Sequence, residues 1–131
     1  MSQTRMKFGK KVLCVLAAVV GLTFVSVAGA TVVYFPDKKL EAAVREKTGK
    51  PTGDITTEDM GRLTSLAAPG QGIQNLAGLE YATNLRYIEL WQNQISDLSP
   101  LAGLKNLLGL GVDQNRVSDL SPLAGLTKLQ E

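Results

Sequence analysis

The 131-residue sequence contains no histidine and only one cysteine, Cys14. Without histidine, the chain has no Ser-His-Asp or Cys-His catalytic arrangement and no imidazole to bind a metal ion. Its acidic residues are scattered and form no Asp-x-Asp-x-Asp calcium loop, so a pair of carboxylates is the remaining catalytic option. The composition therefore favours a protein that is not an enzyme, and we expect no metal site and no cofactor.

The first 30 residues also lack acidic side chains and fall into three parts. A cationic stretch ends at Lys11, an apolar run covers residues 12–27, and small residues form Ala28-Gly29-Ala30. This order is typical of a secretory signal peptide, and we predict cleavage after Ala30. The run is shorter than the ~20 residues that span a bilayer, but it reaches that length if it is counted on to residue 33. A membrane anchor through residues 12–33 is therefore the alternative.

Cleavage would remove Cys14 and the four basic residues of the leader. The mature chain would then have no disulfide, and its stability would come from packing alone. Four of the 14 basic residues of the chain lie in the leader, so residues 31–131 carry ten basic against 12 acidic side chains. The basic balance of the whole chain is therefore no sign of a nucleic-acid partner.

An internal repeat of 22 residues is the strongest signal in the sequence. Residues 85–106 and 107–128 are identical at 12 of the 22 aligned positions. A degenerate copy precedes them at residues 63–84, with Gln71 in place of the repeated asparagine, and a further copy begins at residues 129–131. Both good copies contain the motif Leu-x-x-Leu-x-Leu-x-x-Asn with conservative exchanges. The 22-residue spacing lies within the period of leucine-rich repeats.

The apolar positions of this pattern predict the architecture. Ile88 and Leu90 alternate with residues that would face outward, and Leu110 and Val112 do the same. This alternation indicates short strands with one buried face. A single unit cannot bury its apolar face alone, whereas stacked units can. We expect an α/β leucine-rich-repeat solenoid with short parallel strands on its concave face and a 3-10 or irregular convex side.

The polar positions that recur in the repeat are interpreted as structural. Asn93 and Asn115 follow the strands where the backbone turns inward, and an amide can satisfy both a buried N–H and a buried carbonyl there. Serine followed by proline suits the start of a helical turn, with serine as N-cap and proline as the first helical residue. This prediction concerns Ser99 with Pro100 and Ser121 with Pro122. The preceding Asp97 and Asp119 are expected to help cap these turns rather than to bind metal.

Residues 31–62 are predicted to form a helical cap. Asp37 to Thr48 has apolar residues at helical spacing, an i,i+4 ion pair of Glu41 with Arg45, and a stop at Gly49 and Pro51. Thr56 and Asp59 match a capping box for a second short helix, with Ile55 and Met60 as its hydrophobic staple. Helices placed before a solenoid would cover the end of its core.

Three features together resemble bacterial internalin-type leucine-rich-repeat proteins. They are Phe35-Pro36-Asp37-x-x-Leu40-Glu41-x-Ala43-Val44-Arg45, then Ile55-Thr56-Thr57-Glu58-Asp59, and the 22-residue repeats with Ile95-Ser96-Asp97-Leu98-Ser99-Pro100-Leu101. The resemblance implies export to the bacterial surface or medium, a helical cap, and a curved array that engages protein partners through its concave face. Arrays of that family are usually longer, and the sequence shows neither a carboxy-terminal cap nor a cell-wall sorting motif, so we expect this chain to be a fragment or a truncated gene product.

Partner binding is the function that these observations favour. The outward strand residues should form a three-by-three patch whose middle row carries the only tryptophan of the chain and a tyrosine, and such aromatic residues often dominate binding energy. The partner is expected to be a protein, or alternatively a surface glycan. The alternative functions are a structural or membrane-anchored segment of a longer envelope protein and the non-catalytic part of a secreted enzyme. The predicted contact residues are Tyr87, Glu89, Trp91, Gly109, Gly111 and Asp113, beside Ser65, Ala67 and Pro69 of the first copy.

Overall fold

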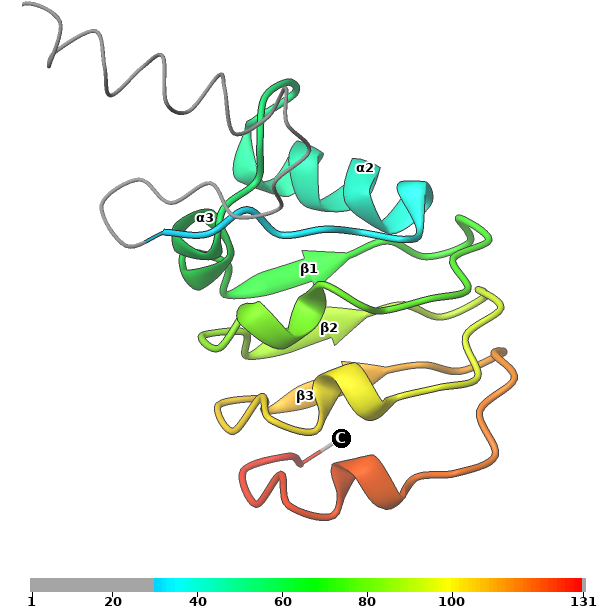
Figure 1. The fold of residues 1–131 in the computed structure, drawn as a ribbon. Helices are drawn as coiled ribbons and strands as arrows, with labels where there is room; N and C mark the ends of the chain where they lie inside the picture. Colours follow the sequence, from blue (N-terminus) through cyan, green and yellow to red (C-terminus); the bar gives the residue numbers. More distant parts are fainter. Residues whose placement is uncertain (1–29, 131) are drawn as a thin grey trace, which may run out of the picture. The chain divides into compact units, whose positions relative to one another are not determined.

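The computed structural model describes residues 30–130. The chain divides into two compact units, residues 1–32 and residues 33–131, and the second unit contains all the helices and strands described below. Within residues 30–130, two α-helices come first, and short strands then alternate with 3-10 turns (Figure 1). The elements are α2 (Lys38–Thr48), α3 (Thr57–Gly61), β1 (Ser65–Ala67), η1 (Leu79–Tyr81), β2 (Tyr87–Glu89), η2 (Ser99–Leu101), β3 (Gly109–Gly111) and η3 (Ser121–Leu123).

The three strands form one parallel sheet in the order β1-β2-β3. Leu66 pairs with Ile88, and Ile88 pairs with Leu110, so each strand residue lies beside its equivalent in the next repeat. The sheet register is therefore the sequence period itself. The 3-10 turns stack on the opposite side of the units (Figure 1), which confirms the predicted solenoid with parallel strands and 3-10 connections.

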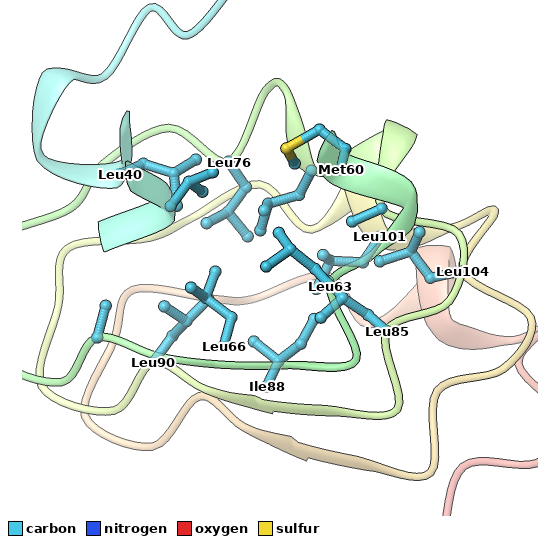
Figure 2. Close-up of a cluster of buried hydrophobic side chains, with 14 of the residues drawn as sticks. Leu40, Met60, Leu63, Leu66, Leu76, Leu85, Ile88, Leu90, Leu101 and Leu104 are labelled. Carbon is cyan, nitrogen blue, oxygen red and sulfur yellow. The ribbon is translucent and has the colours of Figure 1, made fainter. Parts of the chain in front are cut away.

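The repeated leucines and isoleucines fill the space between the strands and the 3-10 turns (Figure 2). Ile88 and Leu90 enter this core from the β2 segment, and Leu101 enters it from η2, each with 0% of its surface exposed. A buried aliphatic side chain of this size contributes about 1.5–3 kcal/mol relative to its exposed state. The stacking of equivalent side chains thus provides the stability that a single repeat lacks.

Helix α2 begins and ends at the residues that the sequence indicates. The carboxylate of Asp37 accepts hydrogen bonds from the N–H groups of Lys39 and Leu40, and Gly49 ends the helix with a left-handed φ of 68°. Glu41 and Arg45 form the expected i,i+4 ion pair, with 2.8 Å between Oε1 and Nη2. The predicted helix over these residues is confirmed.

Helix α3 is a short helix with a complete capping box. The Thr56 hydroxyl accepts a hydrogen bond from the Asp59 N–H, and the Asp59 carboxylate accepts one from the Thr56 N–H. Ile55 and Met60 are both buried, as a hydrophobic staple requires. α2 contacts β1 and α3 contacts η1, so both helices lie at the β1 end of the repeats. Their role as a cap remains a prediction.

The third repeat is packed less completely than the second. Leu110 and Val112 are only partly buried, whereas their equivalents Ile88 and Leu90 are fully buried. Among the described residues, the chain that follows the third repeat contributes one backbone bond at this edge, from Gln130 N–H to Leu108 O at 2.9 Å. The core contacts of the second repeat are therefore formed from both sides, and those of the third mainly from one.

The predicted serine caps are wrong by one residue. Ser99 is the first residue of η2 rather than its N-cap; Leu98 holds the cap position, and no side-chain cap bond is formed there. The turn is a 3-10 turn closed by the Leu101 N–H donating to Leu98 O at 2.9 Å, so its capping carbonyl comes one residue earlier. Pro100 is accordingly the second residue of the turn.

The aspartate before each serine binds the N–H group that the proline-containing turn leaves free. Asp97 Oδ1 accepts from the Ser99 N–H at 2.8 Å, and in the next repeat Asp119 Oδ1 accepts from the Ser121 N–H at 2.9 Å. The backbone bond from Ser99 lowers the pKa of Asp97 below its ordinary value. Ser121 starts η3 as Ser99 starts η2, with Pro122 second.

Candidate interaction surface

The strand register brings the predicted outward residues together. Tyr87 lies between Ser65 and Gly109, and Glu89 lies between Ala67 and Gly111. The outward residues of each repeat thus form a row along its strand, and the β2 row lies in the middle. Two backbone hydrogen bonds extend this order beyond the strands: the Gly70 N–H donates to Trp91 O at 3.0 Å, and the Gln92 N–H donates to Asp113 O at 2.9 Å. The sheet face, as we call this surface, consists of Ser65, Ala67, Pro69, Tyr87, Glu89, Trp91, Gly109, Gly111 and Asp113.

The middle row of the sheet face carries its large side chains. Tyr87 is 51% exposed and Trp91 is 40% exposed, and the Glu89 carboxylate between them in sequence is also exposed. The β1 row holds smaller residues, of which Ser65 and Pro69 are half-buried. A partner that approaches the sheet would therefore meet the residues of the β2 segment.

The glycines of β3 make room for the β2 side chains. A Cβ atom at Gly109 would lie 3.1 Å from Cδ1 of Tyr87, closer than nearly all such contacts, and one at Gly111 would collide with the Glu89 carboxylate. Tyr87 and Glu89 thus lean over the next row, where no side chain competes with them. The sequence shows the two glycines but not the direction in which their neighbours lean.

A hollow of about 460 Å³ lies over β3 at this edge of the sheet face. Tyr87 and Glu89 bound it, Asp113 adds a second carboxylate, and no lysine or arginine is among its lining residues. An aromatic ring beside two carboxylates suits a hydrogen-bond donor or a positively charged group of a partner. The remaining lining residues are Leu108, Gly109, Leu110, Gly111 and Gln130.

Asn93 holds the backbone behind this surface. Its Oδ1 accepts from the N–H groups of Gln71 and Ile73 at 3.0 and 2.9 Å, which belong to the preceding repeat. Its Nδ2 donates to Ala68 O and Leu90 O, both at 2.9 Å. The side chain is 7% exposed and is the only buried polar side chain of the described residues. These are the bonds that a structural role for this amide requires.

Asn115 repeats this arrangement one unit later with less burial. Its Oδ1 accepts from the Ile95 N–H at 3.0 Å, and its Nδ2 donates to Leu90 O at 2.8 Å and to Val112 O at 2.9 Å. The residue is half-buried because the third repeat is itself less covered. The two asparagines form a ladder that ties each repeat to the one before it.

Sequence reasoning missed the glutamine that precedes each asparagine. Gln92 and Gln114 have left-handed φ values of 58° and 56°, and Gln92 Nε2 donates to Gln114 Oε1 at 2.9 Å. The left-handed backbone turns the chain inward directly after Trp91, which is why the asparagine amide can reach the core side. The identity of the two glutamines at the 22-residue spacing was the available signal.

Asp37 has a second contact that its position before a helix does not reveal. Its Oδ2 accepts from the N–H groups of Gln74 and Asn75 at 2.7 and 3.1 Å, while its Oδ1 caps α2. Burial raises the pKa of this carboxyl, but the backbone hydrogen bonds lower it by more, so the pKa lies below 3.8. One aspartate thus joins α2 to the loop of the first repeat.

Two features, a metal-binding cluster and a membrane-spanning helix, are absent from residues 30–130. No group of three or more aspartate, glutamate, cysteine or histidine side chains in this range is placed to hold a metal ion. None of the helices in the same range is long and apolar enough to cross a bilayer. The predicted signal peptide at residues 1–30, the alternative anchor and Cys14 lie outside the described residues except at their ends.

The repeats of this chain are similar to those of known proteins. A family model described as leucine-rich repeats in two copies matches residues 83–125. Internalin H of Listeria monocytogenes is 38% identical over 66 residues, which cover 49% of this chain and 12% of that protein. The chain carries leucine-rich repeats of the bacterial internalin type. This confirms the resemblance seen in the sequence.

Solved structures agree with the internalin-type fold. An internalin (inlF) from Listeria monocytogenes has a TM-score of 0.72 at 37% identity, over 74% of this chain and 29% of that one. An internalin C2 (inlC2) from the same species has a TM-score of 0.60 at 32% identity, over 81% of this chain and 58% of that one. The chain thus spans less than two thirds of each of these relatives.

Proposed function

We propose that this chain is a partner-binding module of a secreted or surface-attached bacterial protein, and that it engages a protein through its sheet face. The observation that carries the proposal is the middle row of that face. Tyr87 and Trp91 are half exposed at the parallel sheet, and the glycines of the next row leave a hollow beside Tyr87. Aromatic side chains at such positions dominate the binding energy of many protein interfaces.

The rigidity of the support favours binding over a purely structural role for these aromatics. The backbone on both sides of Trp91 is fixed by hydrogen bonds to neighbouring repeats, and Asn93 anchors the turn that follows it. A side chain on a fixed backbone loses less conformational entropy when it meets a partner. Internalin-type relatives make a protein the first partner class to test, and a surface glycan the second.

The test begins with an array of purified extracellular protein domains, probed with the purified chain, followed by affinity measurements with alanine variants. Tyr87→Ala and Trp91→Ala should each weaken binding by about 30-fold or more, the effect of losing a hot-spot residue worth about 2 kcal/mol. Tyr81→Ala is the matched control, because this tyrosine is 45% exposed but lies on η1. It should leave affinity unchanged.

The same variants distinguish binding from packing. If Trp91 only shields the sheet, Trp91→Ala lowers the melting temperature and leaves affinity unchanged after correction for the folded fraction. If Tyr87→Ala and Trp91→Ala both bind as wild type while folded, the sheet face is not the binding surface. That outcome would favour a structural or anchoring role for the sheet face.

A further inference from the structure

A second hollow lies at the amino-terminal ends of the strands, apart from the residues proposed to meet the partner. The Arg86 N–H donates to Thr64 O at 2.8 Å, and the Leu108 N–H donates to Arg86 O at 2.7 Å. These three residues therefore lie side by side in successive repeats. They line a hollow of about 380 Å³ with Asn84, Asn106 and Lys128.

The charged residues that line this hollow are all basic. Arg86 and Lys128 are both exposed, and no aspartate or glutamate is among the lining residues. Within the described part of the chain, the Arg86 guanidinium has no hydrogen bond and no ion pair, although its backbone is fixed. By contrast, the Arg45 guanidinium is bound to a glutamate and to two carbonyls. The five N–H donors of Arg86 are thus available to a ligand.

The two asparagines that line the hollow are fixed by hydrogen bonds to backbone carbonyls, and one of them positions the second cation. Asn84 Nδ2 donates to Gly61 O at 2.7 Å, and Asn106 Nδ2 donates to Thr83 O at 3.1 Å. Asn84 is thereby fixed to the end of α3, and Asn106 to the repeat before its own. Asn106 Oδ1 in turn accepts from Lys128 Nζ at 3.0 Å, which holds the ammonium group at the same hollow. The lysine keeps two further donors for a ligand.

We propose that this hollow binds an oxyanion, the group shared by carboxylates, sulfates and phosphates, with Arg86 as the main ligand residue and Lys128 as the second. A planar guanidinium donates two parallel hydrogen bonds to two oxygens of such a group, and an ammonium adds a point charge beside it. The Thr64 hydroxyl is a third donor at the rim. This site does not depend on the proposed function, because its charged residues lie outside the sheet face.

The test is a titration of the purified, isotope-labelled chain followed by nuclear magnetic resonance. Sodium acetate, sodium sulfate and inorganic phosphate are added separately, with sodium chloride used to keep the ionic strength constant. At least one of the three should produce a saturable shift of the Arg86 Nε–H signal and of the Leu108 amide. The anion that saturates at the lowest concentration identifies which oxyanion the site prefers.

Variants of the two cations make the result specific. Arg86→Gln and Lys128→Gln should each weaken binding, measured at the Leu108 amide, by about tenfold or more, since charge-assisted hydrogen bonds are lost. Arg116→Gln is the matched control, because this exposed arginine is not among the residues that line the hollow. It should leave the affinity as in wild type.

Two outcomes would overturn the proposal. Shifts that rise linearly with every anion, and equally at Arg86 and Arg116, would mean that the anions only screen surface charge. Saturable binding that survives in both the Arg86→Gln and Lys128→Gln variants would place the anion elsewhere. Both side chains are exposed, so neither substitution removes core packing and the variants should stay folded.

Discussion

Replacing Asn93 by alanine should destabilise the repeats more than the same change at Asn115. In the second repeat, the substitution would leave the Ile73 N–H and the Ala68 carbonyl without their buried partner, whereas the Leu90 carbonyl would keep its hydrogen bond from Asn115 Nδ2. An unsatisfied buried backbone group costs about 1–3 kcal/mol. Two such groups give a loss of at least about 2 kcal/mol in the free energy of unfolding, even at the lower end of that range.

The equivalent groups around Asn115 are less buried, and water can replace part of their hydrogen bonds. Its bonds to Ile95 N, Leu90 O and Val112 O are all only partly buried. Asn115→Ala should therefore cost about 1–2 kcal/mol. Because both variants remove the same atoms from the same motif, the difference between them measures the effect of burial.

Urea unfolding followed by circular dichroism and by the fluorescence of the single tryptophan measures both losses. Variants with unchanged slopes against denaturant and shifted midpoints would report stability alone. The reasoning is refuted if Asn93→Ala costs less than about 1 kcal/mol, or if the two variants lose the same free energy. Either result would mean that water satisfies the backbone groups of both repeats equally well.

Three further predictions rest on the same structure. Leu98→Ala should cost about 2–5 kcal/mol and Leu120→Ala much less, in the same urea assay, because Leu98 is 1% exposed and Leu120 is 61% exposed; equal losses would contradict this difference in packing. Hydrogen bonds lower the folded-state pKa of Asp37, so its stabilisation is full above the ordinary value of 3.8 and is lost as the pH falls through the lower folded-state value. Stability measured against pH should consequently be flatter in Asp37→Asn below 3.8, and a profile as steep as that of wild type would exclude this contribution. Export from a bacterium should yield a product that begins at Thr31 by intact mass, whereas a membrane-bound species that retains Met1 would favour the anchor.

Periodicity was sufficient to predict the architecture of this chain. A 22-residue repeat with alternating apolar residues determines strand register, because equivalent residues must stack. The helix of residues 38–48 and the capping box at Thr56 were likewise predictable, since both depend on interactions between residues close in sequence. Which residues face outward on the strands follows from the same alternation.

Features that depend on three-dimensional packing were not predictable in the same way. The serine caps were placed one residue too late because the sequence does not distinguish a 3-10 turn from the first turn of an α-helix. The contact of Asp37 with residues 74 and 75, and the hollow around Arg86, join segments that are far apart in the sequence. The leaning of Tyr87 over Gly109 depends on a side-chain rotamer that periodicity does not specify.

The fluorescence of Trp91 during titration with the protein partner tests the central proposal most directly. Trp91 is the only tryptophan of the chain and is 40% exposed, so its emission reports on the sheet face alone when the partner domain lacks tryptophan. If the sheet face is the binding surface, the emission should shift to shorter wavelength and saturate at the affinity measured independently, as the indole leaves water. A partner that binds at that affinity with unchanged Trp91 emission would contradict the account.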